Sequence, residues 1–269
     1  MINGIVENVE LYNTLFKELK RINRRLITNI CYGQSELKEL FETRQVTYEY
    51  EETAYLMLYV REHDFLRVFF LVANTNADIE TNKTNQVMVY DIFENEEKIN
   101  RGQDNRIYLE GFNEYKKYHR WICKDAIVEN MSLEEQFVAR EELTQEALEI
   151  LTHIFDKYCD YIPDEQNMKK YFESHQGILI YERASNKLLA GLLYKVEGSV
   201  ITEDFIFVDE AIKGKGVGRW MQNFLFCIFR EQKNMKYIAW INDENTASKN
   251  LHLKSGYKLD TISKITYKK

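Results

Sequence analysis

A short segment, residues 213–219, combines glycines and cations in the way that phosphate-binding loops do. It reads Lys-Gly-Lys-Gly-Val-Gly-Arg. Glycines permit backbone conformations that a Cβ would block, so that successive N–H groups can converge on one anion. The lysines and the arginine add full charges, and hydrogen bonds to charged groups contribute about 1.5–3 kcal/mol each, against about 1 kcal/mol for neutral ones. The segment is therefore a candidate cradle for a phosphate or pyrophosphate.

Two familiar phosphate loops have a different spacing from this one. A Walker A loop has four residues between its first glycine and a Gly-Lys-Ser/Thr ending, and the sequence contains no such string. The dinucleotide fingerprint is G-x-G-x-x-G, whereas Gly214, Gly216 and Gly218 are spaced as G-x-G-x-G. A glycine-rich helix entry with solvated lysines stays open as the alternative to an anion site.

The residues on either side of the loop predict a strand before it and a helix after it. Residues 205–208 form a short, apolar, partly β-branched run, which is typical of a buried strand. Beyond the loop, apolar residues recur at three- and four-residue spacing on one helical face: Val217, Trp220, Met221, Phe224, Leu225 and Ile228. The order strand, glycine turn, helix places the loop at the positive end of a helix dipole.

The loop and a second motif downstream resemble the GNAT superfamily of N-acetyltransferases. A basic residue, two positions, glycine, one position and glycine is similar to the acyl-CoA pyrophosphate loop of that family, with Lys213 where Arg or Gln is usual. A predicted strand at residues 237–241 follows, and then a segment with the spacing of the family's second motif: Asn245, Ser248, Leu251, Gly256 and Tyr257. The resemblance covers residues 135–269.

The resemblance implies a fold class, a cofactor and a set of binding residues. The fold is α/β (α+β), with a central mixed, mostly antiparallel sheet flanked by helices, and the cofactor is acetyl-CoA as acyl donor. The amides of the strand end are expected to bind the acyl carbonyl and pantetheine, and Asn245 to hold the pantetheine arm or the helix entry. The cofactor-binding residues expected from the resemblance are Phe207, Val208, Lys213, Gly214, Lys215, Gly216, Val217, Gly218, Arg219, Asn245 and Ser248.

Acyl transfer to an amine requires a base for the amine. An alkylamine with a pKa near ~10.4 is neutral in only about one molecule in 2,500 at pH 7, a handicap of roughly 4.6 kcal/mol that a positioned base would offset. Glu203 and Asp204 lie on the strand where many family members carry a catalytic glutamate. Strand alternation sends them to opposite faces, and we take Glu203 as the candidate base. A solvated strand end is the alternative.

The leaving thiolate requires a proton. Family members often supply it from a tyrosine in the second motif, and this chain has His252 at that position. Histidine has an unperturbed pKa near ~6.5 and is chemically able to act as the acid. A non-catalytic His252 is the alternative interpretation.

Composition limits the classes of function. The chain has 269 residues, of which 45% are hydrophobic, enough for one large core or two smaller ones. A net charge of −7 argues against general binding to nucleic acid or to anionic membranes. The four cysteines are scattered without a C-x-x-C pair, which is typical of buried thiols rather than of a disulfide or zinc framework. The cysteine spacing thus predicts no metal site, and with no long apolar run or signal-type leader we predict a cytoplasmic protein.

The N-terminal half is predicted to be a degenerate copy of the C-terminal half. Residues 55–74 and 178–197 both read as two strands around a charged turn, and Gly111-Phe112 recurs 145 residues later as Gly256-Tyr257. We therefore predict a structural or acceptor-binding domain at residues 1–130, with helices within residues 8–43 but no glycine loop, and a catalytic domain at residues 131–269. Chance similarity of short apolar hairpins is the alternative.

The sequence thus predicts an N-acyltransferase that passes the acetyl group of acetyl-CoA to a primary amine. The acceptor is a small molecule or peptide, and the amine attacks directly in a ternary complex because no nucleophile for a covalent intermediate is indicated. Two alternatives stay open. One is an aminoacyl-tRNA-dependent transferase of the Fem type, which also pairs two GNAT-like domains. The other is a non-catalytic CoA sensor or scaffold, because the family's tyrosine is missing at position 252. The sequence names neither the acceptor nor the oligomeric state.

Overall fold

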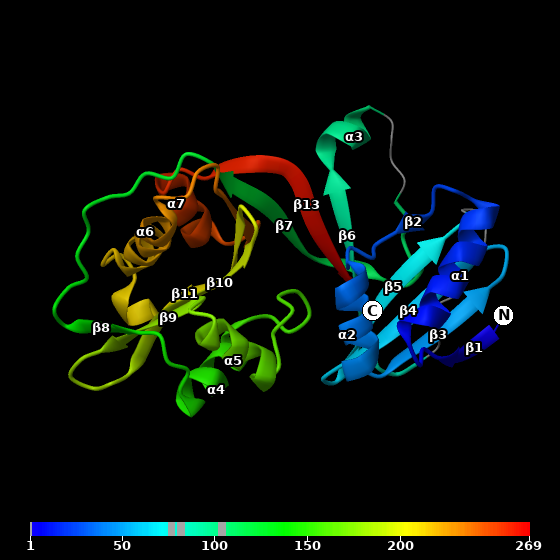
Figure 1. Ribbon diagram of the computed structural model, residues 1–269, viewed down its shortest axis with the longest axis horizontal. Coiled ribbons are helices and arrows are strands. Elements are labelled where there is room, and N and C mark those ends of the chain that lie inside the picture. The colour runs from blue at the N-terminus through cyan, green and yellow to red at the C-terminus, as the bar shows by residue number, and fades with distance from the viewer. Residues whose placement is uncertain (1, 75–78, 80–83, 102–105) are drawn as a thin grey trace. The chain divides into compact units, whose positions relative to one another are not determined.

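The computed structural model describes residues 2–74, 79, 84–101 and 106–269, and the chain divides into two compact units (Figure 1). The N-terminal unit comprises Met1–Lys117 and Ser263–Lys269, and the C-terminal unit comprises Tyr118–Ile262. The sequence placed the division after residue 130. In the structure it falls between Lys117 and Tyr118, inside a strand, and the end of the chain returns to the N-terminal unit.

The N-terminal unit is built on a mixed sheet. Its strands follow in space as β1 (Ile2–Ile5), β3 (Val46–Glu51), β4 (Tyr55–Glu62), β5 (Phe65–Val72) and β6 (Val87–Asn95), and then the end of β13 (Lys258–Lys268). A short strand, β2 (Ile27–Thr28), pairs with β5. The β1–β3, β3–β4 and β4–β5 pairs are antiparallel, and the β5–β6 pair is parallel.

Two helices cover one face of this sheet. α1 (Val9–Ile22) and α2 (Gln34–Thr43) bury their apolar sides against β3, β4 and β5, and a short α3 (Glu96–Asn100) follows β6. Asn8 caps α1 by accepting a hydrogen bond from the Leu11 N–H at 3.0 Å. The side chains of β4 alternate between two clusters, one under these helices and one on the other face, so the strand is buried on both sides.

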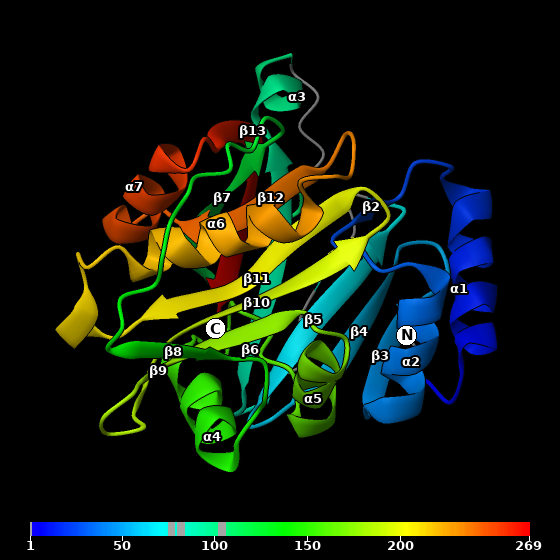
Figure 2. The same cartoon turned by 60° about the vertical axis from the view of Figure 1, so that its left-hand side comes forward.

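The C-terminal unit has its own mixed sheet. Its strands follow in space as β7 (Asn113–Cys123), β12 (Lys236–Asn242), β11 (Val200–Val208), β10 (Leu188–Glu197), β9 (Gly177–Glu182) and β8 (Phe137–Arg140). Only the β11–β12 pair is parallel among the pairs of this set. α6 (Val217–Phe229) packs on one face of the sheet, and α4 (Gln145–Ile154) and α5 (Glu165–Glu173) pack on the other. Figure 2 shows α6 crossing β10 and β11.

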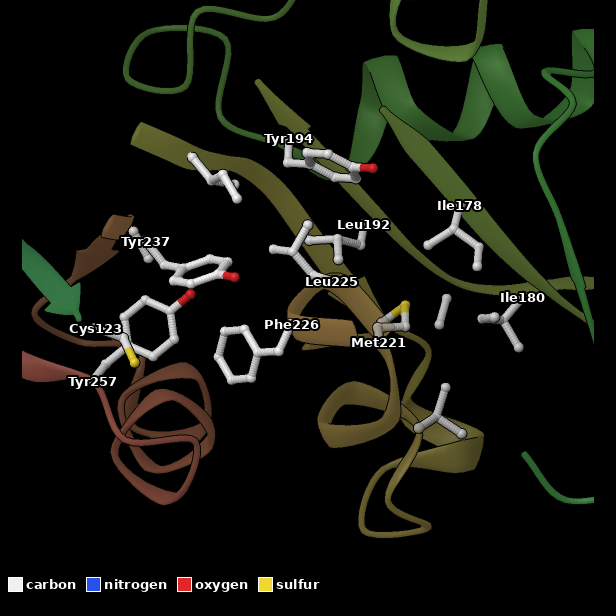
Figure 3. Packing of buried hydrophobic residues seen from close by; sticks show 14 of the residues in the cluster. Cys123, Ile178, Ile180, Leu192, Tyr194, Met221, Leu225, Phe226, Tyr237 and Tyr257 are labelled. Atoms are coloured by element: carbon white, nitrogen blue, oxygen red, sulfur yellow. The ribbon is translucent and has the colours of Figure 1, made fainter. Parts of the chain in front are cut away.

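The helix after the glycine loop confirms the predicted element but not all of its buried face. Val217, Met221 and Leu225 are buried as expected, and Figure 3 shows Met221 and Leu225 among apolar side chains of the sheet. Ile228 is 45% exposed, contrary to the prediction, and Phe226 is buried instead. The helix therefore presents a face turned slightly from the one that the apolar spacing indicated.

Two long strands each belong to both units. β7 has its first residues in the N-terminal unit and Tyr118–Cys123 in the C-terminal unit, and β13 has Lys258–Ile262 in the C-terminal unit and its remainder in the N-terminal one. Each is 11 residues long and is preceded by a glycine with positive φ, +79° at Gly111 and +89° at Gly256. The two halves thus use the same glycine-and-strand ending, as the proposed duplication predicts.

Candidate functional site

The two parallel strands of the C-terminal unit pair over only part of their length. Residue pairs run from Val200–Lys236 to Glu203–Ala239, although β11 continues to Val208 and β12 to Asn242. On its other side β11 stays paired with β10 as far as Val208–Ala190. Within the described chain, the edge of β11 after Glu203 therefore has no strand beside it on the β12 side.

The backbone of β11 directs alternate residues toward that edge. The Asp209 N–H donates to the Leu189 carbonyl at 2.7 Å, so the backbone groups of Phe207, two residues earlier, also point toward β10. The groups of Ile206 and Val208 consequently point away from β10. Of the two residues predicted to present amides, Val208 thus has its N–H on the open edge and Phe207 does not.

A bulge sets which side chains of β11 face which helices. Ile201 and Glu203 lie on the α6 side of the sheet, whereas Phe205 and Phe207 pack with α4 and α5. The register with β10 shifts at Leu193/Tyr194, and the pairing passes over Asp204. The alternation therefore changes phase just where β11 leaves β12.

The predicted glycine loop joins β11 to α6. A single 3-10 turn, η1 (Glu210–Ile212), leads into it, and Gly214 and Gly216 adopt φ of +83° and +79°. These are conformations in which an L side chain is strained. The Trp220 N–H bonds to the Gly216 carbonyl. In the described chain the N–H groups of residues 216–219 have no hydrogen-bond acceptor, as expected for a helix N-terminus without a side-chain cap.

The three cations of the loop differ in their surroundings. Lys213 pairs with Glu210, and Arg219 pairs with Glu129, both near the surface. Lys215 is exposed and forms no ion pair with the part of the chain that the structure describes. An anion bound at the loop could therefore pair with Lys215 directly. To pair with Lys213 or Arg219, it would have to replace the carboxylate that each now contacts.

The second motif organises α7 (Thr246–Lys254) and its contact with α6. Asn245 caps α7, accepting a hydrogen bond from the Ser248 N–H at 3.0 Å. A Cβ on Gly218 would lie 3.2 Å from Leu251 Cδ2 and 3.5 Å from Val208 Cγ2. The glycine thus allows α6 to approach α7 and the end of β11 closely. Asn245 serves the helix entry, one of the two roles expected for it.

The two predicted catalytic residues lie together, in the interior. His252 Nε2 is 3.2 Å from Glu203 Oε2, and each side chain is only 1% exposed. Two residues that the sequence analysis did not propose complete the contacts of this carboxylate. Gln222 Nε2 lies 3.4 Å from Oε2, and the Tyr257 hydroxyl donates to Oε1.

The sequence contains a feature that could have indicated each of Tyr257 and Gln222. Tyr257 is the final aromatic residue of the second motif, and Gln222 is a polar residue beside the apolar face of a helix. Burial and the negative charge of Glu203 raise the pKa of Tyr257 well above its ordinary value of 10.0, so its hydroxyl keeps its proton. Figure 3 shows Tyr257 near Tyr237, Phe226 and Cys123.

Asp204 lies on the opposite face of β11 from Glu203, as strand alternation predicted. It accepts a hydrogen bond from the Tyr171 hydroxyl at 2.5 Å and lies 3.4 Å from Lys195 Nζ. Burial, and then the charge of Asp204, raise the pKa of Tyr171 above its ordinary range. The carboxylate is thus tied to α5 and β10.

The described residues lack two further kinds of feature. No helix there is long and apolar enough to cross a membrane. No group of three or more His, Cys, Asp or Glu side chains in the same residues is arranged to hold a metal ion.

Comparison with known proteins places these features in a family. A model described as the acetyltransferase (GNAT) family matches residues 140–257, which include both the glycine loop and the second motif. A search of curated protein sequences found no match.

Several solved structures share the fold. A GCN5-related N-acetyltransferase from Sphaerobacter thermophilus is 10% identical, with a TM-score of 0.60 over 100% of this chain and 95% of that one. A tandem GNAT protein from the clavulanic acid biosynthesis pathway is 7% identical, with a TM-score of 0.58 over 100% and 98%. A GCN5-related glucosamine N-acetyltransferase region of a fungal multi-domain GH3 beta-N-acetylglucosaminidase is 9% identical, with a TM-score of 0.61 over 99% of this chain and 38% of that one. Residues 140–257 thus belong to the GNAT acetyltransferase family, in a chain whose whole length has the mixed α/β fold of a tandem GNAT protein.

Proposed function

We propose that the protein is an acetyl-CoA-dependent N-acetyltransferase whose C-terminal unit holds the cofactor. One observation carries the proposal. The unbonded N–H groups of residues 216–219 and the outward N–H of Val208 lie at the two ends of one short connection, between β11 and α6. An acyl-CoA carries a pyrophosphate for the first set of donors and an amide-containing pantetheine arm for the second.

The pyrophosphate would be held by the start of α6. Backbone N–H groups at a helix N-terminus bind anions because they point along the axis and the dipole is positive there. Lys215 would add its charge without breaking an existing ion pair. Lys213 and Arg219 would exchange Glu210 and Glu129 for phosphate oxygens. Gly214, Gly216 and Val217 set the turn, and Asn245 and Ser248 order the adjoining helix.

The pantetheine arm would extend the sheet. An extended amide-containing chain can add to an open strand edge through backbone hydrogen bonds. Val208 offers its N–H and carbonyl at this edge, and the departure of β12 after Ala239 leaves the position beside it without a strand in the described chain.

The chemistry is attack of a neutral amine nitrogen on the thioester carbonyl, with loss of the C–S bond. The amine gives up one proton, and the thiolate takes one. All three described donors to Glu203 are buried protein groups, so we propose that Glu203 acts through His252 rather than on the amine directly. His252 then has the role of the acid in place of the family's tyrosine. The acceptor is a primary amine of a small molecule or peptide.

Thiol release from acetyl-CoA, measured over a panel of amines, polyamines, amino acids and peptides, tests this function. We expect release that depends on the amine. Gly216→Glu should abolish it, because a side chain at φ +79° strains the turn and a carboxylate repels the pyrophosphate. Gly198→Glu is the matched control. That glycine also has positive φ, +60°, and open space around it, but it lies in the turn before β11.

The outcomes separate the candidate functions. Amine-dependent release by wild type and Gly198→Glu, and none by Gly216→Glu, supports the enzyme. Acetyl-CoA binding without release for any amine would overturn catalysis in favour of a CoA sensor. No acetyl-CoA binding would refute the assignment and direct the search to another acyl carrier.

A further inference from the structure

The contacts of Glu203 determine where the protons of its network can be. We use the name Glu203 network for five side chains: Glu203 on β11, Gln222 on α6, Ser248 and His252 on α7, and Tyr257 after it. The Gln222 amide and the Tyr257 hydroxyl both donate to the carboxylate. Two such donors stabilise an ionised carboxylate more than a protonated carboxyl group, which has a donor of its own and weaker acceptors.

The two ring nitrogens of His252 both face hydrogen-bond acceptors. Nε2 faces Glu203, and Nδ1 faces Ser248. His252 Nδ1 lies 2.8 Å from the Ser248 carbonyl oxygen and 3.3 Å from Ser248 Oγ. A carbonyl oxygen can only accept, so this short contact requires a proton on Nδ1. On the other side of the ring, Nε2 faces a carboxylate that is already ionised, so this contact requires a proton too. The geometry is that of an imidazolium between a carboxylate and a carbonyl.

Burial makes this arrangement costly unless it is complete. A charged pair away from water is destabilising if one member is removed or left without its hydrogen bonds. In this network each oxygen of Glu203 has a donor and each nitrogen of His252 has an acceptor. The Gln222 carbonyl oxygen is itself buried with no hydrogen-bond partner among the described residues, so Gln222 keeps its amide on Glu203 at a cost.

We propose that Tyr257 and Gln222 are positioning residues that keep Glu203 ionised, so that His252 is held as an imidazolium ready to protonate the leaving thiolate. This inference rests on the proposed function and deepens it. Of the five side chains, only that of Ser248 is partly exposed, and its hydroxyl is the outer end of the network. Ser248 Oγ passes one proton to the thiolate as it takes one from His252 Nδ1, and the proton that the amine releases restores the imidazolium.

Among the residues that the structure describes, the other ionisable groups that face the carboxylate keep their charge near neutral pH. The titratable groups that face Glu203 from the packed elements are His252 on α7, Tyr257, Tyr237 on β12 and Cys123 on β7. Burial raises the pKa of Tyr237 to about 12 and that of Cys123 to about 11, so both stay neutral. A change in the pH dependence of activity in variants of this network therefore reports the proton that lies between Glu203 and His252.

Opposite shifts in the pH profile test the proposal. When the Glu203–His252 pair loses its shared proton, Glu203 remains ionised and His252 becomes neutral. Tyr257→Phe removes a hydrogen-bond donor that stabilises the ionised carboxylate, so the pair should hold its proton more tightly. The alkaline limb of kcat should therefore move to higher pH. The plateau of kcat should be lower, because the shared proton lies more often on Glu203 and less imidazolium forms. Gln222→Leu should act in the same direction and by less. Glu203→Gln removes the anion beside the ring, so the limb should move to lower pH by about one unit or more.

Tyr237→Phe is the matched control, since it removes a buried hydroxyl from the same core without a bond to Glu203 in the described contacts, and it should leave the limb in place. Shifts of Tyr257→Phe and Glu203→Gln in one direction, or no shift in either, would overturn the proposal.

Nuclear magnetic resonance of the imidazole nitrogens gives a readout that does not depend on turnover. The His252 signal, assigned by its loss in His252→Asn, should be that of an imidazolium at pH 7.5 in wild type and of a neutral ring in Glu203→Gln. A neutral ring in folded wild type refutes the proposal even if acetyl transfer is established. An imidazolium in a protein that transfers no acetyl group would mean that the proposed function fails while the network stands as described.

Discussion

Each unit contains a pair of parallel strands that separate partway along their length. In the described chain, the strand edge that this exposes is covered in the N-terminal unit and uncovered in the C-terminal unit. β5 and β6 pair from Phe65–Val87 to Arg67–Val89 and then part, as β11 and β12 part after Glu203–Ala239. In the N-terminal unit the chain itself covers the released edge. β2 pairs with Leu71 and Val72 of β5. In the C-terminal unit no described strand takes that place.

A single side chain completes the closure of the N-terminal edge. Asn29 accepts a hydrogen bond from the Phe70 N–H at 2.8 Å and donates one to the Val68 carbonyl at 3.0 Å. Its carboxamide thus makes the pair of bonds that an amide of a pantetheine arm would make with an open strand. A separating parallel pair therefore does not by itself leave a strand edge open to an amide-containing ligand. The edge must also be free of the protein's own amides.

The two separation points differ in charge and in the segment that comes after each of them. Arg67, the last paired residue of β5, is fully buried and lies 3.0 Å from Glu62 and 3.4 Å from Asp91, where the C-terminal unit has Glu203 with His252. Residues 73–86, between β5 and β6, contain no glycine. The described part of that segment forms no helix, whereas the C-terminal unit has the glycine loop and α6 at this point. The described part of the N-terminal unit therefore has neither an open strand edge nor a glycine loop leading into a helix at this point.

The largest expected effect is a loss of stability when the covered edge of β5 loses Asn29. Asn29→Ala leaves the Phe70 N–H and the Val68 carbonyl buried without their partner, which should reduce the free energy of unfolding by about 2–4 kcal/mol. Asn23→Ala, which removes a partly buried hydrogen bond to the Ala73 carbonyl and an exposed one from the Arg25 N–H, is the control and should cost about 1 kcal/mol. Urea denaturation measures both. Equal small losses would show that Asn29 does not close this edge.

A smaller effect, on acetyl-CoA affinity, is expected from a change at the open edge of β11. Val208→Pro removes the outward N–H, which bonds to no described strand, so the fold should tolerate it as an edge-strand proline. Acetyl-CoA should bind about tenfold more weakly, the equivalent of one hydrogen bond of about 1.4 kcal/mol. Titration calorimetry measures the affinity, and thermal unfolding checks the fold. Unchanged affinity would mean that the cofactor does not use this edge.

The thiol of Cys31, close to the closed edge, should report its opening. Although Cys31 is exposed, desolvation of its thiol and the negative charge of Asp91 raise its pKa above the ordinary 9.0. Less thiolate is present at a given pH, so alkylation by iodoacetamide should be slow at pH 8 and rise with a midpoint above pH 9. In Asn29→Ala the segment loosens, the pKa falls toward its ordinary value, and alkylation of Cys31 at pH 8 should become several-fold faster by mass spectrometry. An identical rate would contradict the closure.

The smallest effect concerns the anion cradle. Glu129→Gln releases Arg219, while the bonds of Asn223 to the backbone of residue 129, at 2.7 and 3.0 Å, keep that segment in place. The pair is near the surface, so the gain in acetyl-CoA affinity should be about two- to fourfold at low salt and should vanish at high salt. Glu231→Gln, which frees the exposed Arg230, should have no effect. Weaker binding in Glu129→Gln would mean that Arg219 does not meet the phosphates.

Much of the geometry of the candidate site in the C-terminal unit was predictable, because its signals are local in sequence. Glycines at Gly214 and Gly216 stand where φ is positive, and the strand and helix beside them follow from short-range periodicity. The opposite faces of Glu203 and Asp204 follow from strand geometry alone. The bulge at Asp204 and the donors to Glu203 depend on residues that are distant in sequence, so no local pattern could supply them.

The N-terminal unit was less predictable for the same reason. A two-residue strand such as β2 has no periodicity to detect, and Asn29 closes an edge about 40 residues away, within a stretch predicted as helices. The two compact units divide inside β7, where a continuous strand has no linker composition that a sequence pattern could detect. Pairings between distant strands, rather than local propensity, determine both features.

The central claim is that one unit binds acetyl-CoA and the other has closed the corresponding edge. Calorimetric titration of the full chain with acetyl-CoA tests this most directly, because the stoichiometry counts the sites. We predict one molecule bound per chain, with binding lost in Gly216→Glu and still one per chain in Asn29→Ala. Two molecules per chain, or binding that survives in Gly216→Glu, would contradict the account.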